Sequence, residues 1–244
     1  MTIDAKGIYY RQLNERVREE IDKGAKEVVL DNVNGQRYIA DGLRAKATIT
    51  INGVPGNDLA AFMDGPTLIV NGNAQDGVAN TMNDGKIVIN GNAGDVLGYG
   101  MRGGKLYIKG DVGYRVGIHM KGFKSQIPVI IAGGTAGDFF GEYMAGGLLV
   151  LLGIGRKEGE PIAGGYLGTG MHGGVMYLRG EVDPRDCGAE IGILEPNEEE
   201  MAELSKYVKE YCEDTGHDYA EIMKEKFIKI YPKSSRPYGR LYAY

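Results

Sequence analysis

A methionine that returns at a fixed interval is the feature that most constrains the fold of this 244-residue chain. Four methionines stand nineteen residues apart, and two more follow after 24 and 27 residues: Met63, Met82, Met101, Met120, Met144 and Met171. A fixed period of this order is typical of repeat architectures, in which each unit stacks on its neighbours. Each unit can therefore be aligned on its methionine.

The aligned units share one strand and two corners. Apolar pairs stand five and seven residues after the methionine, as Leu68/Val70, Ile87/Ile89, Leu106/Ile108, Leu149/Leu151 and Met176/Leu178. This period of two places both members of a pair on one face of a strand. Nineteen residues are too few for a helix and a strand with two turns. Each unit therefore predicts one coil of a parallel β-helix, with the methionines stacked inside it.

Glycine, with 40 of the 244 residues, explains how such coils turn. Two corners spell G-x-G-x-x-G, at 98–103 and 168–173. A dinucleotide-binding loop with this spelling needs a helix after it, whose N-terminus binds the phosphates. Short apolar runs closed by glycine follow instead, at 105–110 and 175–180. The two spellings are therefore interpreted as corners of coils, where glycine accepts positive φ.

The repeat defines the fold class. Six coils run from about residue 49 to 180, and a seventh, over 42–53, has Arg44 at the methionine position and is expected to cap the stack. Crossovers between parallel strands favour the right hand. We predict an all-β chain, built as a right-handed parallel β-helix of about seven coils with α-helices flanking it at both ends.

The two ends of the chain predict helices that cover the solenoid. Residues 9–23 place apolar side chains at helical spacing, and Asn197 with Glu200 forms a capping-box pattern that opens a second helix to about Glu213. A third short helix is expected after Gly216. The tyrosine-rich end, 231–244, is expected to pack on the solenoid or on a partner. The predicted regions are an N-terminal helix (1–27), the β-helix (28–192) and the C-terminal helices with this tail (193–244).

No complete catalytic set is recognised, so we predict no catalytic, cofactor-binding or metal-binding residue. The histidines are expected at the surface or in a helix cap, and the two cysteines as reduced structural thiols. An acidic row six residues before the methionines could bind a cation, although turn formation also explains it. Outward tyrosines are expected to form a partner interface. The residues concerned are His119, His172, His217, Cys187, Cys212, Asp76, Asp95, Asp138, Tyr99, Tyr107 and Tyr177.

Bulk composition excludes several classes. The net charge of −5 does not indicate a basic surface for nucleic acid. No run of about 18 apolar residues predicts a membrane span. The first twenty residues are too charged for a secretory signal, so we expect a cytoplasmic protein.

Several strings resemble a known family: GNAGDVLGYGMRGGKLYIKGDVG, AGDFFGEYMAGGLLVLLG and LGTGMHGGVMYLRG. They resemble the G-x-G-x-G repeat domain at the C-terminus of the glutamate synthase large subunit. The stretch NVNGQRYIADGL and the ending RPYGRLY are similar to its stand-alone, archaeal-type version. The resemblance implies a right-handed β-helix that packs on a glutaminase and on an FMN- and iron–sulfur-containing synthase. Together these convert glutamine and 2-oxoglutarate to two glutamates, and the reacting groups and cofactors belong to those partners.

Two other interpretations stay open. The same repeat domain occurs as one of the subunits of formylmethanofuran dehydrogenase, where it is again a scaffold in a redox complex. A free-standing hydrolase or acyl or sugar transferase on a left-handed β-helix would be a different class. That fold needs an 18-residue coil of three hexapeptides, and a nineteen-residue coil with one strong strand argues against it. Partner identity, self-association and proximity to an ammonia channel are not determined by the sequence.

Overall fold

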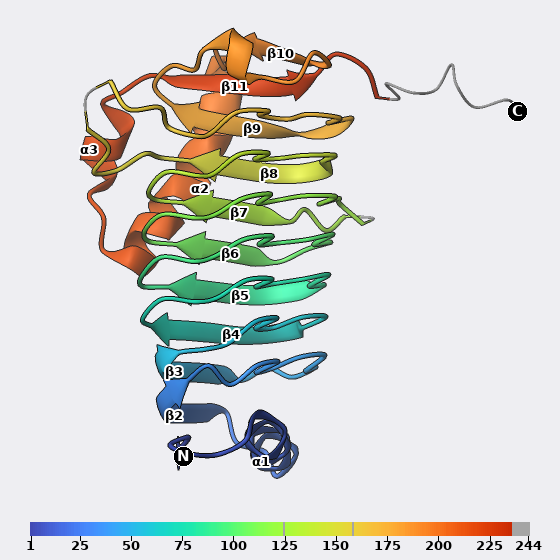
Figure 1. The fold of residues 1–244 in the computed structure, drawn as a ribbon, viewed down its shortest axis with the longest axis vertical. Coiled ribbons are helices and arrows are strands. Elements are labelled where there is room, and N and C mark those ends of the chain that lie inside the picture. The colour runs from blue at the N-terminus through green and yellow to red at the C-terminus, as the bar shows by residue number, and fades with distance from the viewer. Residues whose placement is uncertain (124, 158, 236–244) are drawn as a thin grey trace, which may run out of the picture.

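The computed structural model describes residues 1–123, 125–157 and 159–235 of the chain, which rises as a right-handed parallel β-helix (Figure 1). Consecutive strands of the solenoid pair in parallel, each with the next along the chain, so the predicted fold class is confirmed. These strands are β2 (Glu27–Asn34), β3 (Thr48–Val54), β4 (Asp64–Asn71), β5 (Asp84–Ile89), β6 (Lys105–Ile108), β7 (Val129–Ala132), β8 (Ala145–Leu151) and β9 (Gly173–Arg179).

The interior is built from the side chains that the repeat aligned. Leu68 pairs with Ile87, Ile87 with Leu106 and Leu106 with Ile130, so equivalent apolar residues stack from coil to coil. All six methionines of the repeat are fully buried. The phasing of inward and outward positions is therefore confirmed.

The first coil differs from the prediction in one position. Leu43, not Arg44, takes the place of the methionine: its amide bonds Ala40 O, as the Met63 amide bonds Ala60 O, and its side chain is buried. Arg44 is exposed and bridges to Asp64, the residue after Met63. A spacing of nineteen residues counted back from Met63 misses Leu43, because this coil is one residue longer. Strand β2 also adds a parallel strand below the coils that were recognised.

Both ends of the solenoid are covered. At the N-terminal end, β1 (Thr2–Asp4) pairs in parallel with β2, and α1 (Tyr10–Asp22) buries Leu13 and Val17 against the first coils (Figure 1). At the other end β11 (Phe227–Pro232) pairs antiparallel with β9, and β10 (Ile191–Leu194) pairs antiparallel with β11. A 3-10 turn, η1 (Pro184–Asp186), precedes β10. The sequence did not predict these antiparallel strands.

Helix α2 (Glu198–Thr215) lies along the outer face of the sheet and not on its end (Figure 1). Its predicted capping box is present, with Asn197 and Glu200 bonded to each other's backbone amides. Lys105 Nζ lies 2.5 Å from Glu210 Oε2, and Lys86 Nζ lies 2.7 Å from Asp214 Oδ2, which fixes the helix across β5 and β6. The short helix α3 (Tyr219–Met223) follows.

Two tyrosines that were expected at a partner interface belong to this α2–sheet contact. Tyr107 and Tyr177 point outward from the coil, but α2 covers that face and leaves them 0% and 5% exposed. Tyr211 of α2 meets Tyr107 edge to face, with ring centroids 5.8 Å apart. The chain itself therefore occupies this interface. The tyrosine-rich end lies mostly outside the described residues.

In the described parts of the chain, no helix is both long and apolar enough to cross a membrane.

Candidate functional site

The G-x-G-x-G corner has an alternating backbone that explains its glycines. Three residues before Met101 are left-handed: Val96 with φ 59°, Gly98 with φ 65° and Gly100 with φ 56°. Their amides bond to carbonyls of the coils on alternate sides, as Val96 N to Tyr114 O at 2.8 Å and Gly98 N to Val78 O at 2.8 Å. Each of these amides is already paired within the stack, and a strand follows the corner. The backbone of this motif therefore lacks the free amides of a phosphate-binding loop.

The middle position of this triplet needs a small residue because it points into the solenoid. A Cβ on Gly98 would lie 2.3 Å from Ile130 Cδ1, and one on Gly141 would lie 2.4 Å from Met176 Sδ. Ala60 and Ala79 take the same place in earlier coils and are fully buried. Packing, not ligand binding, accounts for the Ala/Gly rule found in the sequence.

The acidic row is used to join successive coils. Asp76 Oδ1 accepts the amide of Asp95 at 2.9 Å, and Asp138 Oδ1 accepts the amide of Gly165 at 2.9 Å. Asp95 accepts the Tyr114 amide in the same way. Among the described residues no group of three His, Cys, Asp or Glu side chains could hold a metal ion. Hydrogen bonding in the turns thus accounts for the row, and a cation site has no geometric support there.

The three histidines lie on separate parts of the fold. His119 is exposed on the corner surface, whereas the His172 ring bonds Gly170 O at 3.2 Å. His217 Nε2 contacts Lys109 O at 3.3 Å, and burial lowers the pKa of this imidazole. Asp218, not His217, caps α3 through the amides of Ala220 and Glu221, so the predicted capping role of His217 was wrong.

Both cysteines are free thiols, as predicted. Burial raises the pKa of Cys187 and raises that of Cys212 to about 11. A raised pKa disfavours the thiolate, which is the nucleophilic form. Their environments therefore support a structural role.

Aromatic side chains collect on the outer face of the same corners. His119 stacks on Tyr143 with ring centroids 5.3 Å apart and meets Tyr99 edge to face at 5.7 Å. Beside them, Phe139 stacks on Tyr166 at 4.8 Å. We call Tyr99, Arg115, His119, Phe139, Tyr143 and Tyr166 the aromatic corner.

Arg115 orders one part of the aromatic corner. Its guanidinium lies 4.4 Å from the Phe139 ring centroid, and its Nε donates to Glu142 Oε2 at 2.9 Å. Glu142 is 7% exposed, so the ion pair is partly shielded from water. The arrangement holds flat aromatic faces at fixed positions toward solvent.

The side chains of the aromatic corner occupy strained backbone. His119 and Tyr143 directly precede a methionine and have φ 54° and 50°, where the equivalent residues of other coils are Gly100 and Gly170. A bulky residue in this region costs about 1 kcal/mol or more relative to glycine. Gly170 leaves room for its neighbour, because a Cβ there would lie 2.3 Å from Tyr143 Cδ1. The coil does not need these aromatics in order to turn.

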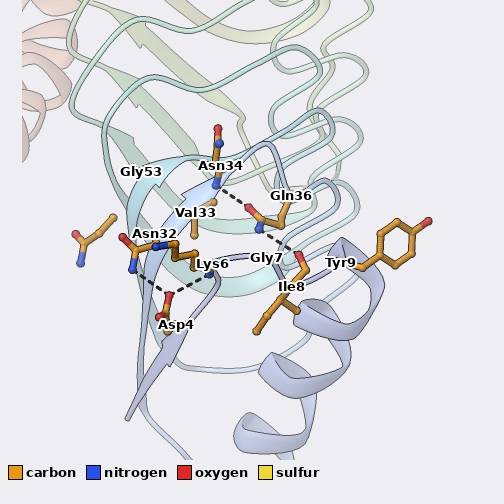
Figure 2. Close-up of a pocket in the computed structure, with 11 residues that line it drawn as sticks. Asp4, Lys6, Gly7, Ile8, Tyr9, Asn32, Val33, Asn34, Gln36 and Gly53 are labelled. Atoms are coloured by element: carbon orange, nitrogen blue, oxygen red, sulfur yellow. Dashed lines mark hydrogen bonds between the residues drawn. The ribbon is translucent and has the colours of Figure 1, made fainter.

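A second surface feature is a pocket of about 960 Å³ at the N-terminal end, between the 4–9 segment and β2 (Figure 2). Its polar groups bond to one another: Asn32 Nδ2 donates to Asp4 Oδ1 at 2.9 Å, and Gln36 donates to the carbonyls of Ala5 and Ile8. These bonds fasten the N-terminal segment to the first coil. The pocket is therefore explained as a joint between β1 and the solenoid.

Comparisons with known proteins agree with this architecture. The profile of the GXGXG motif family matches residues 22–234. The uncharacterized protein MJ1350 of Methanocaldococcus jannaschii is 47% identical over 253 aligned residues, which cover 99% of this chain and 96% of that protein.

A solved structure has a similar fold. A chain of the formyltransferase/hydrolase complex FhcABCD from Methylorubrum extorquens, determined with methylofuran, superposes with a TM-score of 0.65 and 21% identity. The likeness covers 91% of this chain and 87% of that chain. At this identity it establishes a shared fold. With most of its length matched by the family profile, the chain belongs to the GXGXG motif family.

Proposed function

We propose that this chain is a non-catalytic scaffold subunit of a glutamate synthase complex, which converts glutamine and 2-oxoglutarate to two glutamates. It would fix the relative orientation of a glutaminase chain and an FMN-dependent synthase chain. The FMN and iron–sulfur groups would belong to the synthase chain.

One observation supports the scaffold role above the others. The acidic row is bonded to neighbouring coils, while the aromatic corner holds exposed rings on backbone that glycine would adopt more easily. Aromatic and arginine side chains are enriched where protein partners meet. The resemblance to the glutamate synthase repeat domain then supports the identity of the partners.

Reconstitution tests this proposal. The chain is mixed with candidate glutaminase and synthase chains, and size exclusion is followed by an assay of glutamine-dependent glutamate formation. We expect co-elution, and coupled activity that falls when this chain is omitted. Full coupled activity without it, and no co-elution, would refute the scaffold role.

A second candidate function is that of the equivalent scaffold in a formylmethanofuran dehydrogenase-like redox complex. The fold similarity to a chain of FhcABCD favours it. The same mixing experiment separates the two, because the chain would then co-elute with the formyl-transferring subunits and not with the glutaminase. The right-handed coil does not support the left-handed β-helix enzymes considered from the sequence.

A further inference from the structure

The surfaces of the solenoid are unequally available to a partner. The chain's own segments cover both ends, and α2 covers the sheet face over its C-terminal half (Figure 1). The corner face is different: Tyr99, Tyr143 and Tyr166 are 41%, 37% and 59% exposed. Phe62 and Tyr114 lie on equivalent corners of other coils and are also exposed. Large exposed rings are therefore concentrated along one edge of the stack.

Next to the aromatic corner is a small acidic hollow of about 320 Å³, which Asp58, Asp76 and Tyr99 help to line. Gly77 opens it, because this glycine stands where adjacent coils place Asp58 and Val96. Each carboxylate uses one oxygen within the stack: Asp58 Oδ1 accepts Asn80 Nδ2 at 3.2 Å, and Asp76 Oδ1 accepts the Asp95 amide at 2.9 Å. Among the described residues, neither carboxylate forms a salt bridge with Lys or Arg.

Carboxylates without a cation, beside an exposed aromatic ring, are complementary to a guanidinium. Arginine can bond a carboxylate and lie over a ring face at the same time. The apolar rings along the same edge would then bury against the apolar residues that surround such an arginine. Charge and shape on this edge thus specify one kind of occupant.

We propose that the aromatic corner and the acidic hollow together form the docking surface for a partner subunit, which inserts an arginine between Asp58 and Asp76. This inference rests on the proposed function, because the partner is a protein chain of the same complex. The aromatic corner supplies the contact area, and the acidic hollow fixes the register of the partner along the coils.

The test uses the full chain and the partner chains of the reconstituted complex. In one variant Asp58→Asn and Asp76→Asn are combined, which removes two charges but keeps the oxygens that accept the Asn80 and Asp95 hydrogen bonds. In another, Tyr99→Ala is combined with Tyr143→Ala. Glu27→Gln, on the exposed sheet face, and Tyr9→Ala, on the segment before α1, serve as matched controls.

Circular dichroism and melting curves first establish that each variant is folded, and calorimetry or interferometry then gives its Kd for the partner. We expect both double variants to raise Kd about tenfold or more, and the controls to leave it unchanged. Added salt should weaken the wild-type complex more than the complex of the charge variant.

Unchanged affinity of both folded double variants would overturn the docking surface and leave the scaffold role intact. No complex with the wild-type chain would overturn both. If the wild-type chain instead forms dimers that these substitutions dissociate, the occupant is a second copy and the assignment to another subunit is wrong.

Discussion

Gly110→Ala tests whether side-chain ladders determine where the solenoid needs glycine. Gly110 has no positive φ, so any cost must come from space. A Cβ there would lie 2.0 Å from Asn92 Oδ1, the atom that accepts the Asp111 amide at 3.0 Å. Displacing Asn92 loses that hydrogen bond, worth about 1 kcal/mol, and overpacking adds about 1–3 kcal/mol. We expect a loss of about 2–4 kcal/mol, which lowers Tm by about 5–15 °C for a chain of this size.

Chemical denaturation of three further variants checks the reasoning. Gly165→Ala is the control, since a Cβ there meets nothing within 4 Å and φ is not positive, so its stability should stay within about 1 kcal/mol of wild type. Asn92→Gly should cost about 1 kcal/mol alone, and adding Gly110→Ala to it should cost little more, because the clashing atom is gone. If the costs of Gly110→Ala and Asn92→Gly simply add, the steric account is refuted.

Other predictions concern the core and the α2 contact. Met101 is fully buried, so Met101→Ala should cost about 2–5 kcal/mol in denaturant melts and Met101→Asp should prevent folding, while His172→Ala should cost little. The Tyr107 hydroxyl is buried without a hydrogen-bond partner among the described residues, so Tyr107→Phe should leave stability at pH 7 unchanged or slightly higher. Burial raises the pKa of Tyr107, and raises that of Tyr177 to about 12. Their stabilising effect is complete below the unfolded-state pKa of about 10 and falls as pH rises above it. Alkaline melts should therefore lose stability less steeply in Tyr107→Phe, and equal slopes would contradict this assignment.

The repeat determined most of the fold because every coil solves the same packing problem. The fixed spacing of the methionines is enough to locate the buried methionines themselves and the inward residues of the strands. The spacing fails where a coil changes length: an extra residue after Leu43 moves the alignment by one and puts Arg44 at a buried position. A stacked solenoid tolerates such changes at its corners, so a strict period is least reliable in the terminal coils.

The position of α2 was missed although the sequence contains a signal for it. The outward residues of β3 are polar, as Thr48 and Thr50, whereas those of β7 and β8 are apolar, as Ile131 and Val150. A strand that is apolar on both faces must be covered on both sides. The change from threonine to apolar residues thus marks where a helix lies on the sheet. It also explains why Tyr107 was mistaken for an interface residue.

Side chains at equivalent corners have different physical roles, although the sequence alone does not separate them. An aspartate such as Asp95 bonds the next coil and so contributes to the stack, and its loss should be measured as lost stability. Tyr143 is partly exposed on left-handed backbone, so the fold gains little from its ring beyond the stacking on His119. Its replacement by glycine should therefore reduce partner binding more than it reduces stability. The ratio of those two effects, measured residue by residue along the corners, distinguishes the residues that build the solenoid from those that use it.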